Sequence, residues 1–510
     1  MERTRGIQVK QLRAGYTIAT KLLPAGRRVI VDGLSFEVRP GEIAGILGAN
    51  GSAKSTILKA IVDSRSRFGG EVLVDGASLT PGQIAYVPQT PAGTLSPWLD
   101  VRSEIALPRR TQFIPRNEWK AAVDELTEEL RIGLPLDRRV EWLSGGQRVK
   151  VALLRALAVP DRRIFVLDEP FEGLDASTRS TVIQLIRSEV ERGIPVVITS
   201  HRAEDLHALG ARMLTIVGAP VTELVEEPSS PHVRAASTAQ VGQRDDMLST
   251  APVTPDAGQA QRRTTAVLFG TLGFFCGAAA WAVISAIVDN PGLVPSPLSV
   301  LREMIRLPFS SSLAPHFVST MLRAIAGWTV ANLAAVPVGI LLGYDIRCFQ
   351  AVAPWLSIGR ALPIFVLVAP AAGVFPRLPE AQRGSLIFLT LFVISLQVVS
   401  ASAALAPRRR LNIARVFGAS HWFRLSRIMP FEAIGGIFAA LEITLPLSVI
   451  VTLVLETFLI PKSGLGLYVF NHLNDADSSL LFAHILWPAV IVAIALAIVR
   501  SLSRSFRYDL

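Results

Sequence analysis

Long apolar segments are the feature that most restricts how this chain can fold. Six of them approach the ~20 residues that a helix needs to cross the hydrocarbon core of a bilayer, and they lie at about 266–288, 318–343, 350–375, 384–406, 433–459 and 483–503. Residues 264–510 also contain only 27 Asp, Glu, Lys and Arg side chains. We therefore predict an all-α transmembrane domain of six spans over residues 264–510.

Basic residues flank these segments unevenly. With six crossings and both ends on one side, the flanks of that side contain Arg262, Arg263, Arg347, Arg408, Arg409, Arg410, Arg415, Arg424, Arg427, Arg500, Arg504 and Arg507. The opposite loops contain only Arg302, Arg306, Arg377, Arg383 and Lys462. Because cytoplasmic loops carry the excess of Lys and Arg, we expect residues 1–263 to lie in the cytoplasm.

Residues 1–220 have a different pattern, in which short apolar runs alternate with helical periodicity. The runs predict strands at Ile43–Leu47, Ile84–Val87, Ile164–Leu167 and Val196–Thr199, and this alternation is typical of an α/β domain with a substantially parallel sheet. Residues 221–263 are rich in Ser, Thr, Pro and Gln and are expected to form a flexible linker. The net charge of +10 comes without a basic run interleaved with aromatic residues, so we expect no nucleic-acid partner.

A glycine loop follows the first of these strands and precedes a helical pattern. Its sequence is Gly48-Ala49-Asn50-Gly51-Ser52-Ala53-Lys54-Ser55-Thr56. A strand, a glycine loop and a helix N-terminus direct backbone N–H groups at phosphates. Lys54 would reach the β- and γ-phosphates, and Ser55 would ligate Mg²⁺.

Five further polar signals follow at the ends of strands or in loops. Asp168 ends an apolar strand, where it can hold Mg²⁺, and Glu169 beside it can polarise an attacking water. The others are Gln89 after a strand, Leu143-Ser144-Gly145-Gly146-Gln147, Asp175 in Gly173-Leu174-Asp175, and His201 at the end of Val196–Ser200. Each is common as a structural residue, but their order and spacing together indicate one phosphate-transfer site.

These residues resemble the nucleotide-binding domain of ABC transporters over almost all of residues 7–220. The resemblance implies that ATP and Mg²⁺ bind here, with Gly48–Thr56 as the Walker A loop, Gln89 as the Q-loop glutamine and Ser144–Gln147 within the signature. It assigns Asp168 to the Walker B end, Glu169 and His201 to catalysis, and Asp175 to the D-loop. Tyr16 is either an adenine-stacking aromatic or a surface tyrosine, and Ala53 replaces the usual glycine before the lysine.

The resemblance also implies a head-to-tail dimer of two copies. The signature residues of one copy would close over ATP held by the other copy, so that two ATP sites form in a homodimer. The stretch Pro97–Ala106 is similar to importer ATPases of the nitrate, taurine and alkanesulfonate group.

The second half resembles the permeases of the same importers over about 290–505. The loop 407–432 is similar to their cytoplasmic EAA loop, which implies coupling contacts at Ala414 and Gly418, with Asn412 in place of the usual glutamate. A basic amphipathic helix on the membrane surface is the alternative. Ionisable residues inside spans are functional candidates by default, and here they are Arg323, Arg360, Glu442 and Glu456, each of which could equally be a structural pair; Glu442 stands where arginine is usual.

The resulting hypothesis is a fused half-importer in a bacterial inner membrane. It would consist of the ATPase domain 1–220, the linker 221–263 and the permease 264–510. A separate extracytoplasmic binding protein would deliver a small solute, with an organic or inorganic anion as one candidate. An ABC exporter and a membrane-anchored regulatory ATPase are the alternatives.

Overall fold

The computed structural model describes residues 6–20, 23–218, 220–226, 257–306, 314–362, 379–459, 463–471 and 478–506. Contacts divide the chain into two units. The α/β unit comprises residues 1–233, 406–432 and 507–510, and the helical unit comprises residues 234–405 and 433–506. The α/β unit is therefore built from the N-terminal part of the chain together with a segment that lies far along the sequence.

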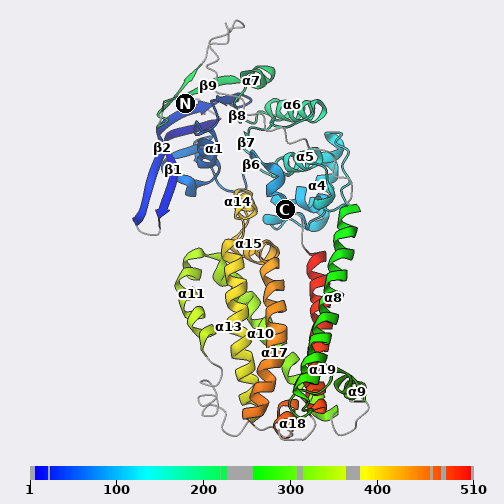
Figure 1. Ribbon diagram of the computed structural model, residues 1–510. Coiled ribbons are helices and arrows are strands. Elements are labelled where there is room, and N and C mark those ends of the chain that lie inside the picture. Colours follow the sequence, from blue (N-terminus) through cyan, green and yellow to red (C-terminus); the bar gives the residue numbers. More distant parts are fainter. Residues whose placement is uncertain are drawn as a thin grey trace, which may run out of the picture. The chain divides into compact units, whose positions relative to one another are not determined.

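A mostly parallel sheet forms the centre of the α/β unit (Figure 1). Its strand order is β10-β9-β3-β8-β7-β6, with only the β9–β10 pair antiparallel. The strands are β3 (Ile43–Leu47), β6 (Ile84–Val87), β7 (Ile164–Asp168), β8 (Val196–Ser200), β9 (Arg212–Val217) and β10 (Glu223–Glu226). The expected α/β fold with a parallel sheet is confirmed, and β10 continues the sheet past residue 220.

Both faces of this sheet are covered, which explains the continuous apolar runs of its strands. Alternate side chains of β7 point to opposite faces: Phe165 and Leu167 join one core cluster, and Ile164 and Val166 join the other. The helices of the unit are α1 (Lys54–Val62), α2 (Val101–Ile105), α3 (Leu107–Thr111), α4 (Arg116–Glu129), α5 (Gly145–Leu157), α6 (Ala176–Glu191) and α7 (Ala203–Leu209).

A second, antiparallel sheet packs beside α1, in the order β2-β1-β4-β5. Its strands are β1 (Ile7–Thr20), β2 (Leu23–Val38), β4 (Arg67–Val74) and β5 (Ala77–Ser78). Short 3₁₀ turns lie at Ser64–Ser66, Pro91–Thr94 and Val140–Trp142. The middle turn, Pro91–Thr94, is named η2 below.

Residues 406–432 fold into the α/β unit as three short helices. They are α14 (Arg409–Val416), α15 (His421–Arg427) and α16 (Met429–Glu432). The turn between α14 and α15 contains Gly418, whose φ of 85° is the left-handed region that glycine adopts without strain. We call residues 406–432 the docked segment.

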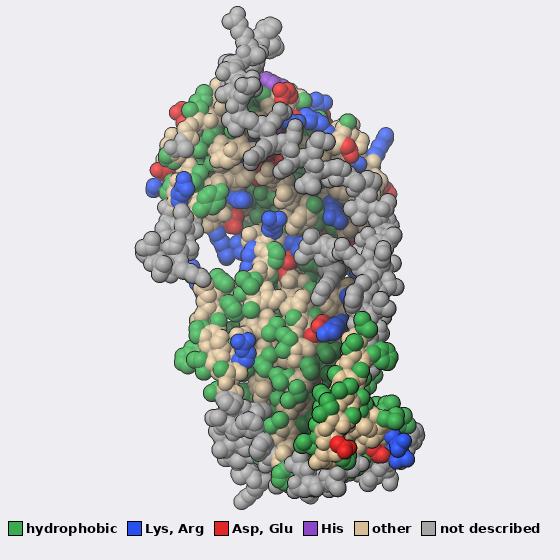
Figure 2. All heavy atoms as spheres, in the orientation of Figure 1, with side chains coloured by type: hydrophobic (Ala, Val, Ile, Leu, Met, Phe, Trp, Pro, Cys, Tyr) green, Lys and Arg blue, Asp and Glu red, His purple; other side chains and the backbone are tan. Residues whose placement is uncertain are grey.

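The helical unit contains four helices that are long and apolar enough to cross a membrane, among the described residues. These spans are Pro315–Tyr344, Arg383–Leu405, Ile434–Thr457 and Ser479–Ser505, within α10 (Ala314–Tyr344), α13 (Pro379–Leu405), α17 (Ile434–Phe458) and α19 (Ser479–Ser505). Helices α10 and α13 approach closely through small residues, since a methyl group on Gly343 would lie 2.4 Å from Ser400 O. Figure 2 shows hydrophobic side chains over much of this unit's visible surface.

The described part of this unit contains four further helices. They are α8 (Ala257–Val288), α9 (Pro297–Arg306), α11 (Ile346–Ala361) and α18 (Leu465–Asn471). Four of the six expected spans thus correspond to candidate spans. For the first, the described residues of α8 contribute the apolar stretch Phe275–Val288. The third coincides with α11 as far as residue 361, and its residues 363–375 lie outside the described residues, as does most of the expected linker.

Candidate functional site: a phosphate loop and a docked segment

The glycine loop connects β3 to α1, as the order of strand, loop and helix predicts. Ala53 is the N-cap of α1 with φ 77° and ψ 8°, and the backbone N–H groups of Thr56 and Ile57 donate to its carbonyl oxygen. Gly51 has φ 83°. A left-handed conformation costs an L-residue roughly 1–2 kcal/mol, so Ala53 holds a strained backbone at the position where the resemblance expects glycine.

Lys54 is buried beneath this loop, where it contacts three oxygens. Its ammonium donates to the carbonyl oxygens of Gly48 (2.7 Å) and Ala49 (3.0 Å), and its Nζ lies 3.0 Å from Glu169 Oε1. The loop turns tightly here: Ser52 N–H donates to Ala49 O at 3.1 Å, and a methyl group on Gly48 would lie 2.4 Å from Ser52 Oγ. The structure therefore brings the loop lysine and the expected catalytic carboxylate together.

Asp168 ends β7 and accepts hydrogen bonds from two hydroxyl groups. Ser55 Oγ donates to Asp168 Oδ1 at 3.2 Å, and Thr199 Oγ1 donates to the same oxygen at 2.8 Å. Burial raises the pKa of Asp168, and the negative charge of Glu169 adds to this effect. A nearby cation stabilises the ionised form of an acidic group whose burial disfavours ionisation.

Glu169 lies next to Asp168 and faces the end of the neighbouring strand β8. Its Oε2 is 3.1 Å from His201 Nδ1, and its backbone N–H donates to Thr199 Oγ1 at 3.0 Å. Its φ of 47° is unusual for a residue with a side chain. Thr199 thus orients both acidic residues; the sequence analysis assigned it no role, although it lies two residues before His201.

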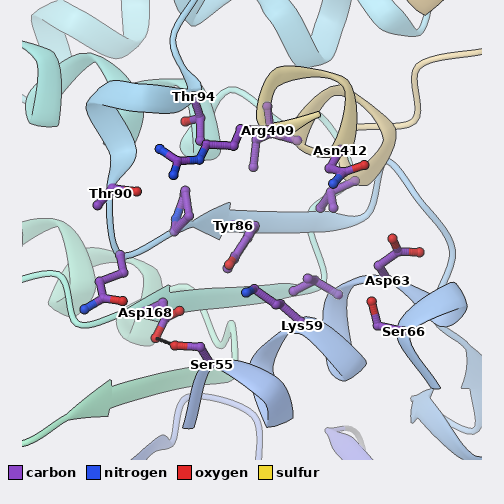
Figure 3. Close-up of a pocket in the computed structure, with 15 residues that line it drawn as sticks. Ser55, Lys59, Asp63, Ser66, Tyr86, Thr90, Thr94, Asp168, Arg409 and Asn412 are labelled. Carbon is purple, nitrogen blue, oxygen red and sulfur yellow. Dashed lines mark hydrogen bonds between the residues drawn. The ribbon is translucent and has the colours of Figure 1, made fainter. Parts of the chain in front are cut away.

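Gln89 reaches the same region from the loop that follows β6. Its amide Nε2 donates to Glu172 Oε2 at 3.2 Å. Gln89, Ser55 and Asp168 together line one pocket (Figure 3). Amide, hydroxyl and carboxylate oxygens are the ligands that Mg²⁺ prefers, so this donor set fits a magnesium ion held with phosphates.

The signature residues lie at the start of α5 and are not among the residues that line this pocket. Ser144 is the exposed N-cap of α5 and forms a capping box with Gln147, in which each side chain accepts a backbone N–H of the other residue. A methyl group on Gly146 would lie 3.9 Å from Asp175 Oδ2, so the signature and the expected D-loop are neighbours. Asp175 caps α6, and the Thr178 N–H that donates to it lowers the pKa of Asp175.

Tyr16 lies on β1 with about half of its surface exposed, and its hydroxyl is 3.0 Å from Thr56 Oγ1 on α1. This contact places the tyrosine beside the first turn of the helix that follows the glycine loop. The geometry agrees with either expected role, stacking or surface.

Donors from the N-terminal part of the chain form hydrogen bonds with the carbonyl oxygens at the C-terminal end of α14. Gly82 N–H donates to Val416 O at 2.8 Å, and Thr111 Oγ1 donates to Phe417 O at 2.7 Å. Gly418 lies against Gly82, since a methyl group on Gly418 would be 3.2 Å from Gly82 Cα. Ala414 is fully buried.

A buried arginine fixes the ends of the docked segment to each other. Arg410 Nε donates to Leu95 O at 2.7 Å, and its Nη1 lies 2.9 Å from Glu432 Oε1. The guanidinium lies over the Trp98 ring, which stacks on Phe431 with centroids 4.9 Å apart. Trp98 belongs to the stretch that resembles the importer ATPases, but its partner was not predicted.

A second buried arginine connects α5 to the docked segment. Arg155 and Glu104 have no exposed side-chain surface, and Arg155 Nη1 lies 2.6 Å from Glu104 Oε1. Arg155 also donates to the carbonyl and hydroxyl oxygens of Thr94, at 2.9 and 2.8 Å, and lies 5.4 Å from the centroid of Phe417. Because these partners are distant in sequence, no spacing signal could have revealed them.

The ionisable residues expected inside the spans mostly form pairs within the helical unit. Glu456 is fully buried and accepts from Arg323 Nη1 at 2.7 Å and from Thr320 Oγ1 at 2.7 Å. Glu442 Oε2 lies 3.2 Å from Arg500 Nε. Arg360 is exposed on α11.

Comparison with known proteins agrees with this geometry. A sequence-family profile described as ABC transporter matches residues 31–172, and the chain belongs to the ABC transporter family. The chain is 33% identical over 233 residues to an aliphatic sulfonates import ATP-binding protein of Xanthomonas axonopodis pv. citri (strain 306), covering 44% of this chain and 91% of that protein. It is 30% identical over 247 residues to a Nod factor export ATP-binding protein of Paraburkholderia xenovorans (strain LB400), covering 46% of this chain and 80% of that protein.

A solved structure of an ATP-binding cassette bound to ADP and phosphate is also similar, at 24% identity and a TM-score of 0.37, covering 43% of this chain and 97% of that one. Family membership makes the α/β unit an ATPase whose hydrolysis of ATP is coupled to transport. The relatives named here correspond to less than half of the chain and include both an import and an export protein.

Proposed function

We propose that the chain is a half-transporter in which ATPase and permease are fused, and that two copies form the working unit. The exposed N-cap Ser144 supports this arrangement, because the signature does not line the pocket of its own glycine loop. A second copy would bring its signature to ATP held by Gly48–Thr56. Each dimer would then have two ATP sites and one central path.

The residues around Glu169 support the hydrolysis step. Glu169 would polarise the attacking water, and His201, 3.1 Å from its carboxylate, would orient the carboxylate and the γ-phosphate. Lys54 must exchange its contact with Glu169 for the phosphates, which frees the carboxylate for this task. Mg²⁺, held by Ser55, Gln89 and Asp168, would neutralise charge that develops on the phosphate oxygens.

The observation that carries the transport function is the docked segment. Residues between two candidate spans, α13 and α17, fold into the α/β unit through Val416, Phe417 and Arg410. A movement of the ATPase would therefore carry the docked segment with it, and this segment continues directly into the two flanking spans. This arrangement suits a transporter better than a regulatory ATPase that uses membrane helices only as an anchor.

We propose import of a small solute across the bacterial inner membrane, with six spans and a separate extracytoplasmic binding protein. The resemblance of residues 407–432 to the importer EAA loop supports this direction, and one relative is named as an aliphatic sulfonates import protein. Organic or inorganic anions are the first solutes to test. Export is the second candidate, because several relatives are named as Nod factor export proteins.

Transport assays with proteoliposomes distinguish the two directions. The full chain is reconstituted, and only the copies whose ATPase faces outward receive added ATP. We expect a labelled solute to leave the lumen when its binding protein is enclosed there, which corresponds to import in the cell. ATP-dependent accumulation in the lumen without any binding protein would establish export instead.

Two variants make the assay specific. Glu169→Gln should abolish both hydrolysis and transport, whereas Glu118→Gln, an exposed carboxylate on α4, should change neither. Full hydrolysis without transport in either direction, for every solute and binding protein encoded beside this chain, would favour the regulatory ATPase.

A further inference from the structure

Helix α9 (Pro297–Arg306) lies at one end of the helical unit, beside the first turns of α19 (Figure 1). Ser479 Oγ donates to Ser299 Oγ at 2.9 Å, and Trp487 Nε1 donates to Met304 O at 2.8 Å. Ser479 is the first residue of the candidate span in α19, and at 1.5 Å per residue Trp487 lies about 12 Å along that helix. These two hydrogen bonds therefore hold α9 beside the end of a candidate span.

This end of the unit is the one at which α17 finishes. The backbone N–H of Gly466 in α18 donates to Glu456 Oε2 near the end of α17 at 3.1 Å. The Tyr468 ring of α18 stacks on His484 of α19, with centroids 4.6 Å apart. Helix α17 begins at Ile434, directly after the docked segment. Helix α9 thus lies at the opposite end of the spans from residue 434, the end that the distribution of basic residues predicts to be extracytoplasmic.

One face of α9 exposes aliphatic side chains. Leu298, Leu301 and Ile305 are between 52% and 68% exposed, and their spacing of three and four residues places them on one side of the helix. We call these three residues the aliphatic stripe. Val300 lies outside the stripe and is buried. Figure 2 shows hydrophobic side chains gathered over α8 and α9, with charged side chains at the edge of this area.

Two arginines border the aliphatic stripe. Arg302 and Arg306 are exposed, and each directly follows a residue of the stripe. Arg306 pairs with Glu303 of the same helix at 3.2 Å, whereas Arg302 has no hydrogen bond or ion pair among the described residues. Because a guanidinium forms paired hydrogen bonds with phosphate oxygens, Arg302 offers a phosphate site next to an apolar surface.

The surroundings of the aliphatic stripe favour lipid over a protein partner. The neighbouring helix α8 exposes Val283, Ile284 and Ile287, which are also aliphatic. The residues that dominate binding at protein interfaces are instead enriched in Trp, Tyr and Arg, with Leu and Val under-represented. Tryptophans are enriched at the level of the lipid headgroups, and the indole N–H groups of Trp281 and Trp487 donate to backbone oxygens just before and within α9.

We propose that α9 is an interfacial helix that binds anionic phospholipid at the extracytoplasmic surface of the membrane. The aliphatic stripe lies between acyl chains, and Arg302 binds the headgroup phosphate. Amphipathic helices of this kind lie at the boundary between headgroups and acyl chains and are attracted to anionic lipids through their basic residues. The proposal rests on the crossing of the membrane by the helical unit, but on neither ATP hydrolysis nor the direction of transport. Because α9 is bonded to α19, the lipid contact fixes the outer end of that span.

The accessibility of a nitroxide spin label tests the contact in vesicles that contain the full chain. Both exposed cysteines, Cys276 and Cys348, are replaced by serine, and a label is attached at Leu301→Cys or Glu303→Cys. The vesicles contain phosphatidylcholine and phosphatidylglycerol. Oxygen partitions into lipid, whereas a nickel chelate stays in water. We expect the ratio of oxygen to nickel accessibility to be at least about threefold higher at Leu301→Cys than at Glu303→Cys, because only the former points toward the acyl chains.

Lipid composition tests the headgroup contact. Omitting phosphatidylglycerol should lower the accessibility ratio at Leu301→Cys, because α9 then moves toward water, and Arg302→Gln should abolish this dependence. Arg116→Gln, at an exposed arginine of α4, should leave the dependence unchanged. A label at Ile494→Cys, an exposed position in the middle of α19, reports whether that span crosses the membrane.

Each of the following results would overturn the proposal. Equal ratios at Leu301→Cys and Glu303→Cys would show that the stripe faces water, and protection of Leu301→Cys from both reagents would show that a second copy or another protein covers it. No dependence on phosphatidylglycerol, or a dependence that Arg302→Gln retains, would remove the headgroup contact. If the nickel chelate also reaches Ile494→Cys, the crossing of the membrane fails and the proposed transport with it, whereas failure at Leu301→Cys alone leaves the transport function standing.

Discussion

Replacing Arg155 with methionine should destabilise the α/β unit severely, because Glu104 would remain buried without its cation. The two side chains have no exposed surface and are 2.6 Å apart. Removing one partner of a buried pair typically costs about 3–5 kcal/mol. At roughly 2–4 °C per kcal/mol for a domain of this size, the melting temperature should fall by about 6–20 °C.

A double-mutant cycle isolates the pair from the other contacts of Arg155. Arg155→Met, Glu104→Leu and the double variant are compared by thermal unfolding of the full chain in detergent. We expect the double variant to be more stable than Arg155→Met, because no charge is then left buried. Arg13→Met serves as the control, since its pair with Asp32 is about half exposed and should contribute less than about 1 kcal/mol.

The refuting result is additivity. If the double variant loses the sum of the two single losses, the charges do not interact and the pair is not the source of the destabilisation. If Arg155→Met melts within 2 °C of the unchanged protein, the buried-charge reasoning fails altogether.

Three further predictions concern the ATP site. Glu169→Gln should lower the rate of ATP hydrolysis at least about 100-fold, which is the effect of losing a general base, and ATP should still bind. A turnover assay measures the loss of hydrolysis, and a nucleotide-binding assay measures the retained binding. Ala53→Gly should stabilise the α/β unit by up to about 1 kcal/mol, since relief of the left-handed strain outweighs the greater entropy of the unfolded chain; a lower melting temperature would contradict it. Asp168→Asn should raise the melting temperature measured without nucleotide at neutral pH, because an acid whose pKa is raised on folding destabilises the folded state when it is ionised. This gain in melting temperature should shrink as the pH falls toward the pKa of the carboxyl. The same variant should lose the stabilisation that Mg²⁺ and ATP give the unchanged protein.

The parallel strands could be predicted from the sequence almost to the residue. The predicted Ile43–Leu47 and Ile84–Val87 agree with β3 and β6, because each is a short apolar run bounded by turn residues and buried on both faces. Four spans were predictable from length and hydropathy alone. The antiparallel sheet was harder to predict from the sequence, because β1 and β2 mix polar and apolar residues and their pairing contains several register shifts.

The site was predictable only where its residues are close in sequence or follow a strand. Lys54, Ser55 and Asp168 follow from local motifs, and parallel strands then bring their ends together. The pairing of Lys54 with Glu169 and that of Arg410 with Leu95 depend on three-dimensional packing between distant segments. The sequence predicted that the loop 407–432 would dock, but not which side chains would fix it.

The docked segment also has a consequence for synthesis of the chain. Arg410 follows its partner Leu95 by 315 residues, and at the ~5–20 residues that a ribosome adds each second roughly 16–63 s separate the two. During that interval Thr111, Leu95 and Gly82 have no partners from the docked segment, and Trp98 lacks both Arg410 and Phe431. The nascent ATPase must therefore remain soluble with an unfilled groove until several spans have entered the membrane, a period in which chaperones or the insertion machinery have access to it.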